Sequence, residues 1–340
     1  MTQPPQPNPV HPLSHQAHEP LVALVRSGLV ESVHYGSWIA LDSTGETITS
    51  AGDPDALIYP RSTLKPLQAF ALLTAGWEGT LEQVALACAS HSGTSTHCDV
   101  VTSTLRDAHL TIDALRNTPD LPLGQNERTE AIRANATPTS LAQNCSGKHA
   151  AMLATCVHNG WDLDSYLDPT HPLQQHIRTT IESFTGEPIT ITSVDGCGAP
   201  LFAMTLRALA HAFTTLATKA HTDSRSPAAN IITAMTTHPT LVAGPGRDVT
   251  DMMVAFPGLV TKDGAEGIHI AVFPDSRVAA LKIADGTNRG RVTAALHLLG
   301  VLGAHDPQLT LAHTPAVLGG GQPVGHTSII PARDTTTTRQ

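Results

Sequence analysis

The chain has 340 residues, only 14% of them charged, and a formal net charge of −9 at pH 7. Its hydrophobic fraction of 41% is too high for a disordered chain. The acidic balance, with no basic run, argues against a dedicated nucleic-acid surface, and no apolar stretch approaches the roughly 18 residues of a membrane span. Only five of its twenty basic residues are Lys, which raises the question of where the chain needs a primary amine.

The two ends of the chain differ in composition from the rest. Residues 1–20 are rich in Pro, Gln and His and lack the apolar segment of a secretory signal, so we expect a flexible tail there and another at 333–340. No linker interrupts 21–332, which is predicted to form one domain. The five cysteines are too few, and odd in number, for a disulfide framework, which favours reduced thiols and a cytoplasmic location.

The first half of the domain begins with strand patterns and continues with helices. An apolar run at 33–41, a turn at 42–45 and a returning arm at 46–50 predict a β-hairpin. The stretch 115–142 is polar and punctuated by Pro, and predicts irregular structure with a short helix at 127–133. Between the hairpin and this stretch, helical periodicity predicts three helices, at 66–76, 81–88 and 96–109.

The second half returns from helices to strands. Helices are predicted at 148–159, 173–184, 199–218, 228–237, 247–255 and 288–303. Strands are predicted at 189–193, 259–260, 268–273 and 278–283. Because strands gather near the two ends and helices in the middle, the pattern favours an α+β fold over a doubly wound parallel sheet. We expect one mainly antiparallel sheet, built from both strand groups and flanked by helices.

The first candidate for chemistry is a Ser-x-x-Lys motif, Ser62-Thr-Leu-Lys65. Residues three apart at a helix start lie on one face, so the Lys65 amine can lie near the Ser62 hydroxyl. If burial lowers the pKa of the lysine, its neutral amine can accept the serine proton. Pro66 places the helix start near Lys65 and leaves Ser62 in the entry turn. A serine cap beside a solvated lysine is the alternative interpretation.

A second candidate follows the helix predicted at 81–88, in the segment Cys88-Ala-Ser-His-Ser-Gly93. A turn at Gly93 can expose Ser90 and His91, which are a nucleophile and a base by type. Neighbours in sequence seldom point at each other, however. An ordinary loop at a helix exit is the alternative.

A third candidate combines two tight glycine turns, Asn144-Cys-Ser-Gly-Lys-His149 and Asp195-Gly-Cys-Gly-Ala-Pro200. Their cysteines, Cys145 and Cys197, suggest a metal site or a reactive thiol, whereas a buried inert thiol is the commonest alternative. Two thiolates fall short of the four ligands of a structural zinc site. A lysine, an aspartate or a water would have to complete the set.

The last candidates are Ala243-Gly-Pro-Gly-Arg247 and Lys262-Asp-Gly-Ala-Glu-Gly267. Arg247 at a predicted helix start suits a carboxylate ligand. Lys262 ends a predicted strand before a glycine turn. The alternative for each is a surface turn, and neither has the spacing of a phosphate-binding Walker motif.

Taken together and in this order, these segments resemble the asparaginase II family, the Rhizobium-type L-asparaginases. Each motif is short, but the ordered set is specific and its spacing covers nearly all of 21–332. The matching segments are Arg61-Ser-Thr-Leu-Lys-Pro-Leu-Gln-Ala69, Cys88–Gly93, Asn144–His149, Asp195–Pro200, Val242–Arg247 and Lys262–Gly267.

The resemblance implies a fold like that of serine β-lactamases and penicillin-binding proteins. It implies two Ser–Lys tandems, Ser62 with Lys65 and Ser90 with Lys262, and a zinc site formed by Cys145, Lys148 and Cys197. It also implies a homodimer. One departure is Thr94, which stands where an acidic residue often follows the second motif. The Ser-x-Asn and Lys-Thr-Gly signatures of penicillin-binding enzymes are not recognisable, which counts against lactam chemistry.

The function implied is the hydrolysis of L-asparagine to L-aspartate and ammonia by a serine nucleophile. We favour Ser62 as that nucleophile, with Ser90 close behind. The candidates for binding the substrate are Arg61 or Arg247 for its α-carboxylate, Asp195 for its α-ammonium, and His149 as a hydrogen-bonding group.

Three alternatives stay open at this point. They are a penicillin-interacting acyl-serine enzyme, a non-catalytic amino-acid or metal-binding module, and a thiol enzyme that uses Cys145 or Cys197. Asparagine and glutamine differ by one methylene, worth about 1–3 kcal/mol in a pocket, so the sequence does not choose between them.

Overall fold

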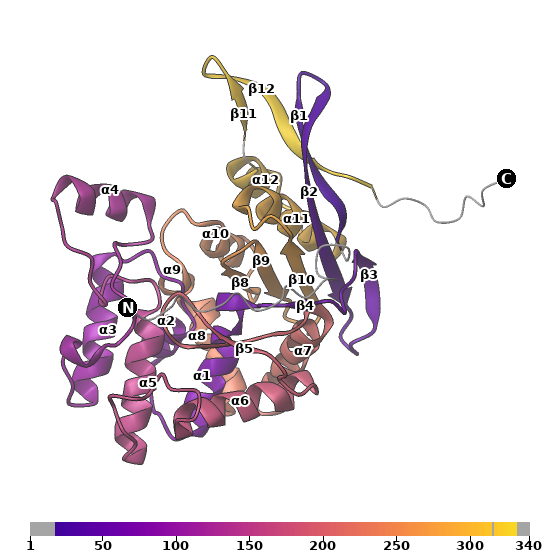
Figure 1. The fold of residues 1–340 in the computed structure, drawn as a ribbon. Helices are drawn as coiled ribbons and strands as arrows, with labels where there is room; N and C mark the ends of the chain where they lie inside the picture. Colours follow the sequence, from indigo (N-terminus) through magenta and orange to yellow (C-terminus); the bar gives the residue numbers. More distant parts are fainter. Residues whose placement is uncertain (1–17, 315, 332–340) are drawn as a thin grey trace, which may run out of the picture.

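The computed structural model describes residues 18–314 and 316–331 (Figure 1). Of the two predicted tails, residues 1–17 and 333–340 therefore lie outside the described residues. The first strand, β1, begins at Glu19, two residues before the predicted start of the domain.

One antiparallel sheet forms the centre of the molecule. Its strands follow the order β11-β12-β1-β2-β10-β9-β8, with β3 paired to β2, and every pairing is antiparallel. The expectation that strands from both ends of the chain form one sheet is confirmed. The strands are β1 Glu19–Arg26, β2 Leu29–Leu41, β3 Thr47–Ala51, β8 Val260–Gly264, β9 Ile268–Val272, β10 Val278–Ile283, β11 Val317–Gly319 and β12 Gln322–Ile329.

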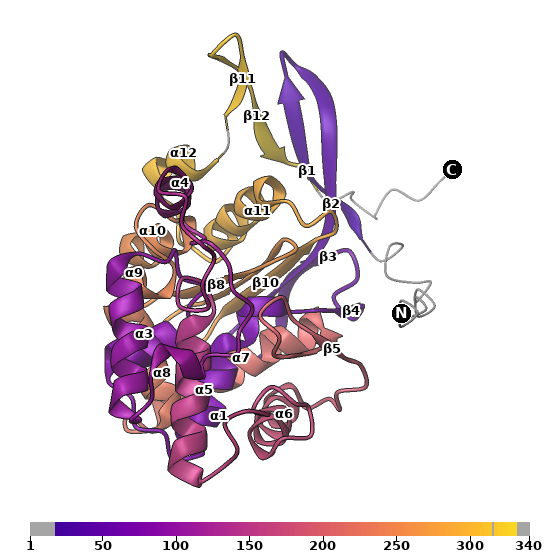
Figure 2. The same ribbon diagram turned by 60° about the vertical axis from the view of Figure 1, so that its left-hand side comes forward.

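Helices cover both faces of this sheet (Figures 1 and 2). The described helices are α1 Lys65–Thr74, α2 Leu81–Ala87, α3 Ser95–Asp107, α4 Gln125–Arg133, α5 Ser146–Asn159, α6 Pro172–Thr185, α7 Leu206–Thr222, α8 Pro227–Thr237, α9 Pro239–Val242, α10 Asp248–Ala255, α11 Asn288–Val301 and α12 Pro307–His313. Short 3₁₀ turns lie at Arg61–Leu64 (η1) and Ile112–Ala114 (η2). The mixture of helices and an antiparallel sheet confirms the predicted α+β class.

The alternation of β2 explains why both faces are covered. Successive strand residues point to opposite faces, and Ile39 and Leu41 pack into the large core that the middle helices form. Trp38 and Ala40 pack into a second core, which includes Leu298 of α11. The sheet is therefore apolar on both sides and forms the middle layer of three.

The structure corrects the helix predicted at 199–218. Two short strands come first, β6 Pro200–Phe202 and β7 Met204–Thr205, and α7 begins only at Leu206. Thr205 caps that helix by accepting a hydrogen bond from the backbone of Ala208 at 2.9 Å. β6 pairs with β5 Thr192–Val194, and β7 pairs with β4 Leu57–Ile58. The Ala/Leu-rich composition marked the helix but not its start.

The sequence patterns also did not predict β1, β11, β12 or α12. Only one of the eight residues of β12 is buried, so this strand lacks a clear apolar alternation. β1 and β2 form one projecting hairpin, and β11 and β12 lie beside it (Figures 1 and 2). Among the described residues, none of the helices has the length and apolar character needed to cross a membrane.

Candidate active site

The Ser-x-x-Lys motif enters the site through a strained turn. η1 carries Ser62, and α1 begins at Lys65, with Pro66 in its first turn as the sequence predicted. Arg61 has a φ of 50°, an uncommon value for a residue with a side chain. This turn leaves Ser62 partly open to a cavity, while the Lys65 side chain is buried.

Lys65 and Lys262 both point at Ser90 rather than one at each serine. The Ser90 hydroxyl lies 3.0 Å from the Lys262 Nζ and 3.2 Å from the Lys65 Nζ. Lys65 also donates a hydrogen bond to the carbonyl of Ala89. The described residues show no hydrogen bond between Ser62 and Lys65. Folding thus brings Ser90 to Lys262, as the family resemblance implied, and adds Lys65 to the same hydroxyl.

Lys262 has the electrostatics of a proton acceptor. Complete burial, the largest effect, and the charge of nearby Lys65 lower its pKa to about 8, while Asp263 opposes the shift. An amine with a pKa near 8 is neutral in roughly a tenth of the molecules at pH 7. A neutral amine 3.0 Å from a serine hydroxyl can take its proton.

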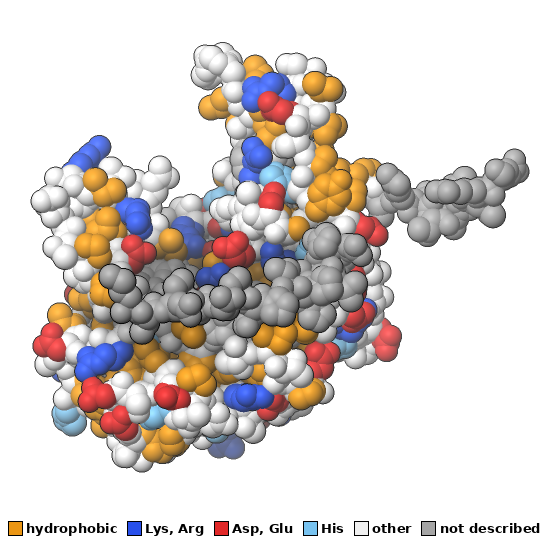
Figure 3. Space-filling model, viewed as in Figure 1, with side chains coloured by type: hydrophobic (Ala, Val, Ile, Leu, Met, Phe, Trp, Pro, Cys, Tyr) orange, Lys and Arg blue, Asp and Glu red, His pale blue; other side chains and the backbone are white. Residues whose placement is uncertain are grey.

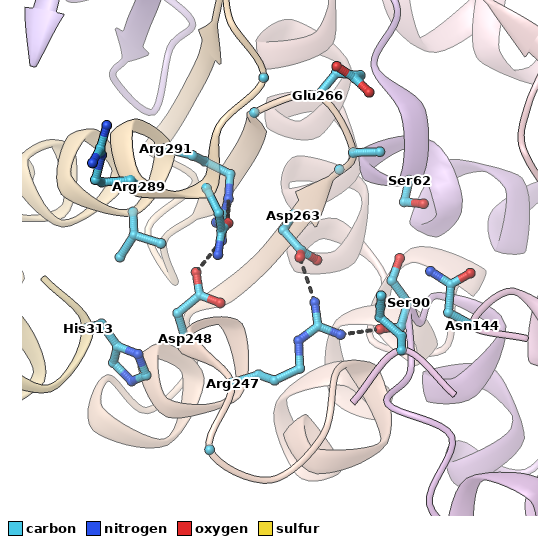
Figure 4. Close-up of a pocket in the computed structure, with 18 of the residues that line it drawn as sticks. Ser62, Ser90, Asn144, Arg247, Asp248, Asp263, Glu266, Arg289, Arg291 and His313 are labelled. Carbon is cyan, nitrogen blue, oxygen red and sulfur yellow. Dashed lines mark hydrogen bonds and ion pairs between the residues drawn. The ribbon is translucent and has the colours of Figure 1, made fainter. Parts of the chain in front are cut away.

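Asp263, which sequence reasoning did not single out, ties Lys262 to Arg247. Its carboxylate accepts from the Lys262 Nζ at 2.7 Å and from the Arg247 guanidinium at 2.7 Å. Arg247 also donates to the carbonyl of Ser90 at 2.6 Å (Figure 4). Both contacts use the Arg247 guanidinium within the protein, so Arg247 holds the Ser90 backbone in place. Asp263 directly follows Lys262 in the segment Lys262–Gly267, and this adjacency could have pointed to its role.

A second ion pair lies beside the first. Arg291 of α11 donates to the Asp248 carboxylate at 2.6 Å and lies 2.9 Å from the Nδ1 of His269 (Figure 4). The Arg291 side chain is only 2% exposed. No motif predicted this pair, whose partners lie 43 residues apart in the chain.

Arg61 and Asp195, predicted to bind opposite ends of the substrate, bind each other. The Arg61 Nε donates to the Asp195 Oδ1 at 2.8 Å. Burial opposes ionisation of Asp195, but Lys148 and Arg61 together lower its pKa below the usual value. Among the described residues, the terminal nitrogens of Arg61 and the Oδ2 of Asp195 have no hydrogen-bond partner. The pair therefore offers a cation and an anion side by side.

Cys145, Lys148 and Cys197 come together, as the family resemblance implied. All three are buried, and the Lys148 Nζ lies 3.4 Å from the Cys197 sulfur. A hydrogen bond with Cys145, aided by the charge of Lys148, lowers the pKa of Cys197 to about 5, although burial opposes the shift. The same hydrogen bond and burial raise the pKa of Cys145 to about 12.

The two thiols of Cys145 and Cys197 and the amine of Lys148 fit a soft divalent cation, on the condition that Lys148 is neutral. No group of three His, Cys, Asp or Glu side chains suited to a metal occurs among residues 18–314 and 316–331, so the lysine must be the third donor. A lysine binds a metal only when neutral. Burial favours that state, but the thiolates raise the pKa of Lys148 above its usual value. Two thiols and one amine fit zinc if binding displaces their protons.

His149 is fully buried beneath this cluster. Its Nδ1 lies 2.8 Å from the hydroxyl of Tyr166, and its Nε2 has no partner among the described residues. Burial holds the pKa of His149 well below its usual value, so the ring is neutral. Its predicted role in substrate binding stays a prediction.

A cavity of about 740 Å³ joins the two serines to the second ion pair (Figure 4). Ser62, Ser90 and Asn144 line one part of it, and Arg289 and His313 line the other. In the space-filling view, basic and acidic side chains lie side by side in a recess between the α4 lobe and the projecting hairpins (Figure 3). The recess is thus polar and carries both signs of charge.

Comparison with known structures gives only distant matches. The structure titled "Crystal Structure Analysis of Mglu" matches with 14% identity and a TM-score of 0.45, covering 79% of this chain and 67% of the other. Its native form is covered over 64% of its length. A β-lactamase from Mycobacterium bovis (Mb2281c) matches with 13% identity and a TM-score of 0.36, covering 78% of this chain and 94% of the other. A comparison with curated proteins gives no match.

Comparison with protein families gives one match over most of the chain. The model of the family described as L-asparaginase II matches residues 22–329, nearly the whole chain. This range contains the η1 turn, Lys65 and Lys262, and the thiol cluster. The chain therefore belongs to the L-asparaginase II family.

Proposed function

We propose that this protein hydrolyses L-asparagine to L-aspartate and ammonia, with Ser90 as the nucleophile. The observation that carries the proposal is the Ser90 hydroxyl, which lies within hydrogen-bond distance of two buried lysines and lines the cavity. Membership of the L-asparaginase II family supports hydrolysis of asparagine in general. The serine mechanism and the substrate are the further steps that we propose.

The reaction divides into two stages. Neutral Lys262 accepts the Ser90 proton, and the serine oxygen attacks the side-chain amide carbon of asparagine. The carbon–nitrogen bond breaks, and ammonia leaves with a proton returned by Lys262. Water then cleaves the aspartyl ester, with the same amine as the base. Before the attack, Lys65 holds the Ser90 hydroxyl by a hydrogen bond.

The Arg61–Asp195 pair suits the two charges of a free amino acid. The α-carboxylate of asparagine can bind the unused nitrogens of Arg61, and its α-ammonium can bind the Oδ2 of Asp195. The 2.8 Å contact between the two side chains then stays intact. Arg247 is less suited to this role, since it already binds Ser90 and Asp263.

Separate alanine substitutions of the two serines test the assignment. We expect S90A to lose turnover by roughly 10³-fold or more, because removing a nucleophile leaves only the binding and electrostatic contributions. We expect S62A to keep measurable turnover, since the described residues give Ser62 no lysine partner. Ammonia release from L-asparagine and L-glutamine is the assay. Full turnover by S90A would exclude Ser90, and loss confined to S62A would return the role to Ser62.

We further propose that Cys145, Lys148 and Cys197 hold a zinc ion near the substrate. When bound, zinc would supply a positive charge that can polarise or orient the substrate. The chain's part is to provide two thiolates and a neutral amine in a buried site. Metal content and protection of the thiols from alkylation, measured with K148M as the variant, test this independently of activity. A homodimer and a cytoplasmic location stay predictions.

A further inference from the structure

The cavity is larger than its proposed substrate needs. Pockets of about 300–1,000 Å³ typically enclose drug-sized ligands, and this cavity of about 740 Å³ lies in the upper part of that range. A free amino acid fills only a fraction of such a volume. The remaining space is lined by side chains and could receive another part of a larger substrate.

The cavity extends from the two serines to Arg289 and His313 (Figure 4). Ser62, Ser90 and Asn144 lie at one end of the site, Arg289 and His313 lie at the other, and Arg247 and Asp263 lie between them (Figure 4). Arg61 directly precedes Ser62 in the chain. An aspartyl group bound at Ser90 would leave the arginine-lined end of the cavity open to its leaving group.

Among the arginines that line this cavity, Arg289 differs in how it is used. Arg247 and Arg291 form ion pairs with Asp263 and Asp248. Arg289 uses only its Nε, which donates to the Nε2 of His34 at 3.1 Å.

The terminal nitrogens of Arg289 have no hydrogen bond to the described residues, so two donors remain for an anion. Arg289 also lines a separate cavity of about 360 Å³ with Glu31, and two further ionisable groups, His313 and Glu266, line the main cavity. His313 binds Asp251 at 2.8 Å. Glu266 also lines a smaller cavity of about 390 Å³, together with Arg61 and Lys282.

We propose that the protein also hydrolyses β-aspartyl amides whose amide nitrogen carries an amino acid, with Arg289 binding the carboxylate of that leaving group. This inference rests on the proposed asparagine hydrolysis. Ser90 attacks the β-carbonyl carbon, the carbon–nitrogen bond breaks, and the amino acid leaves as an amine with the proton from Lys262. Water then releases aspartate, so one water is consumed for each amide bond cleaved.

Three substrates and three variants test this inference. The substrates are L-asparagine, β-aspartyl-glycine and β-aspartyl-glycinamide, which lacks only the terminal carboxylate. The variants are R289Q, R289K and the control R225Q, which alters an exposed arginine outside the cavity. Aspartate release measures all three reactions in the same way.

We expect the wild type to cleave β-aspartyl-glycine, and R289Q to lower kcat/KM for it by about tenfold, the effect of losing one charged hydrogen bond. L-asparagine and β-aspartyl-glycinamide should respond little to R289Q, R289K should recover part of the loss, and R225Q should match the wild type. Turnover of L-asparagine without turnover of β-aspartyl-glycine would overturn this inference alone. Equal losses for all three substrates in R289Q would also overturn it. No turnover of any substrate would overturn the proposed function together with it.

Discussion

At the scale of single residues, the site depends on how a few buried charges are shared. Three of the five lysines, Lys65, Lys148 and Lys262, are at most 2% exposed, and all lie in the proposed catalytic or metal sites. Each proposed role except that of Lys65 needs an amine that can lose its proton. Arg cannot fill such a role, because it keeps its proton in proteins. The presence of Lys at these positions, in a chain that otherwise uses mostly Arg, thus has a physical reason.

The Asp263 carboxylate raises the pKa of Lys262, against the effect of burial. The charged groups around Lys262 are Asp263 on its own strand, Lys65 of α1 and Arg247 before α10, and the Cys88 thiol at the end of α2 is also close. Of these, only the Asp263 carboxylate raises the pKa of Lys262.

We therefore expect D263N to lower the Lys262 pKa below about 8. Because Lys262 must be neutral to accept a proton, activity rises as the pH rises through this pKa. The acid limb of the profile of kcat/KM against pH should then move to lower pH in D263N. D251N, which alters a carboxylate bound to His313, serves as the control and should leave the limb in place. An unmoved limb in D263N would show that another group controls it.

The buried ion pair between Arg291 and Asp248 contributes to the free energy of unfolding. Removing one partner of a buried ion pair leaves an unpaired charge and costs about 3–5 kcal/mol. R291M should lower the free energy of unfolding by that order, as measured by urea denaturation. The double variant R291M/D248N should recover part of the loss, since both charges are then gone. Equal stability of single and double variants would contradict this account.

The motifs in the sequence indicated which residues gather at the site, but not which of these residues hydrogen-bond to each other. The short motifs, through the family resemblance, predicted two tandems, Ser62 with Lys65 and Ser90 with Lys262, whereas the structure brings both lysines to Ser90. They could not show that Lys65 bonds Ser90, because that contact depends on how α1 packs against the loop after α2. The ion pair between Asp248 and Arg291 could not be predicted for the same reason, because it depends on how α10 and α11 pack.

At the scale of elements, periodicity predicted most of the helices and the buried strands. β9 and β10 are apolar and both were predicted near their observed positions. β12 was missed because its residues are mostly polar and only partly buried. The helix predicted at 199–218 was placed too early because Pro200–Phe202 is apolar as well, and apolar runs do not separate strand from helix.

The packing of α5 on α2 depends on Gly147. A Cβ at this position would lie 2.5 Å from the backbone oxygen of Leu86, closer than real contacts allow. We expect G147A to destabilise the protein by about 1–3 kcal/mol through overpacking. Thermal unfolding checks this.

The matched control is G300A in α11, where a Cβ would meet nothing within 4 Å. It should be neutral or stabilising by up to about 1 kcal/mol, because Ala favours a helix more than Gly. Similar unfolding temperatures for the two variants would argue against close packing at Gly147.

At the scale of the whole molecule, the sheet joins the two ends of the chain. β12 pairs with β1 from Val22↔Ile329 to Arg26↔Gly325, and β1 in turn pairs with β2. Segregated strands in the sequence predicted this arrangement in outline. Register and the identity of the edge strands could not be predicted, because they depend on long-range pairing rather than on local pattern.

Removing β11 and β12 should therefore destabilise the whole sheet. A chain ending at Thr314 would leave one edge of β1 unpaired and would uncover Thr327's partner, Thr293 of α11. We expect such a chain to unfold at a lower temperature and to aggregate, as unpaired strand edges do. A chain ending at Pro331 keeps β12 and should behave as the full chain does. Equal unfolding temperatures for the two would show that β12 is dispensable.

The pairing of β1 with β12 also has a consequence for synthesis on the ribosome. β1 emerges about 300 residues before its partner β12. At about 5–20 residues per second, β1 waits on the order of tens of seconds with one edge open. Throughout that interval the nascent chain depends on its β2 hairpin partner, or on a chaperone, to keep that edge from pairing with a neighbouring copy.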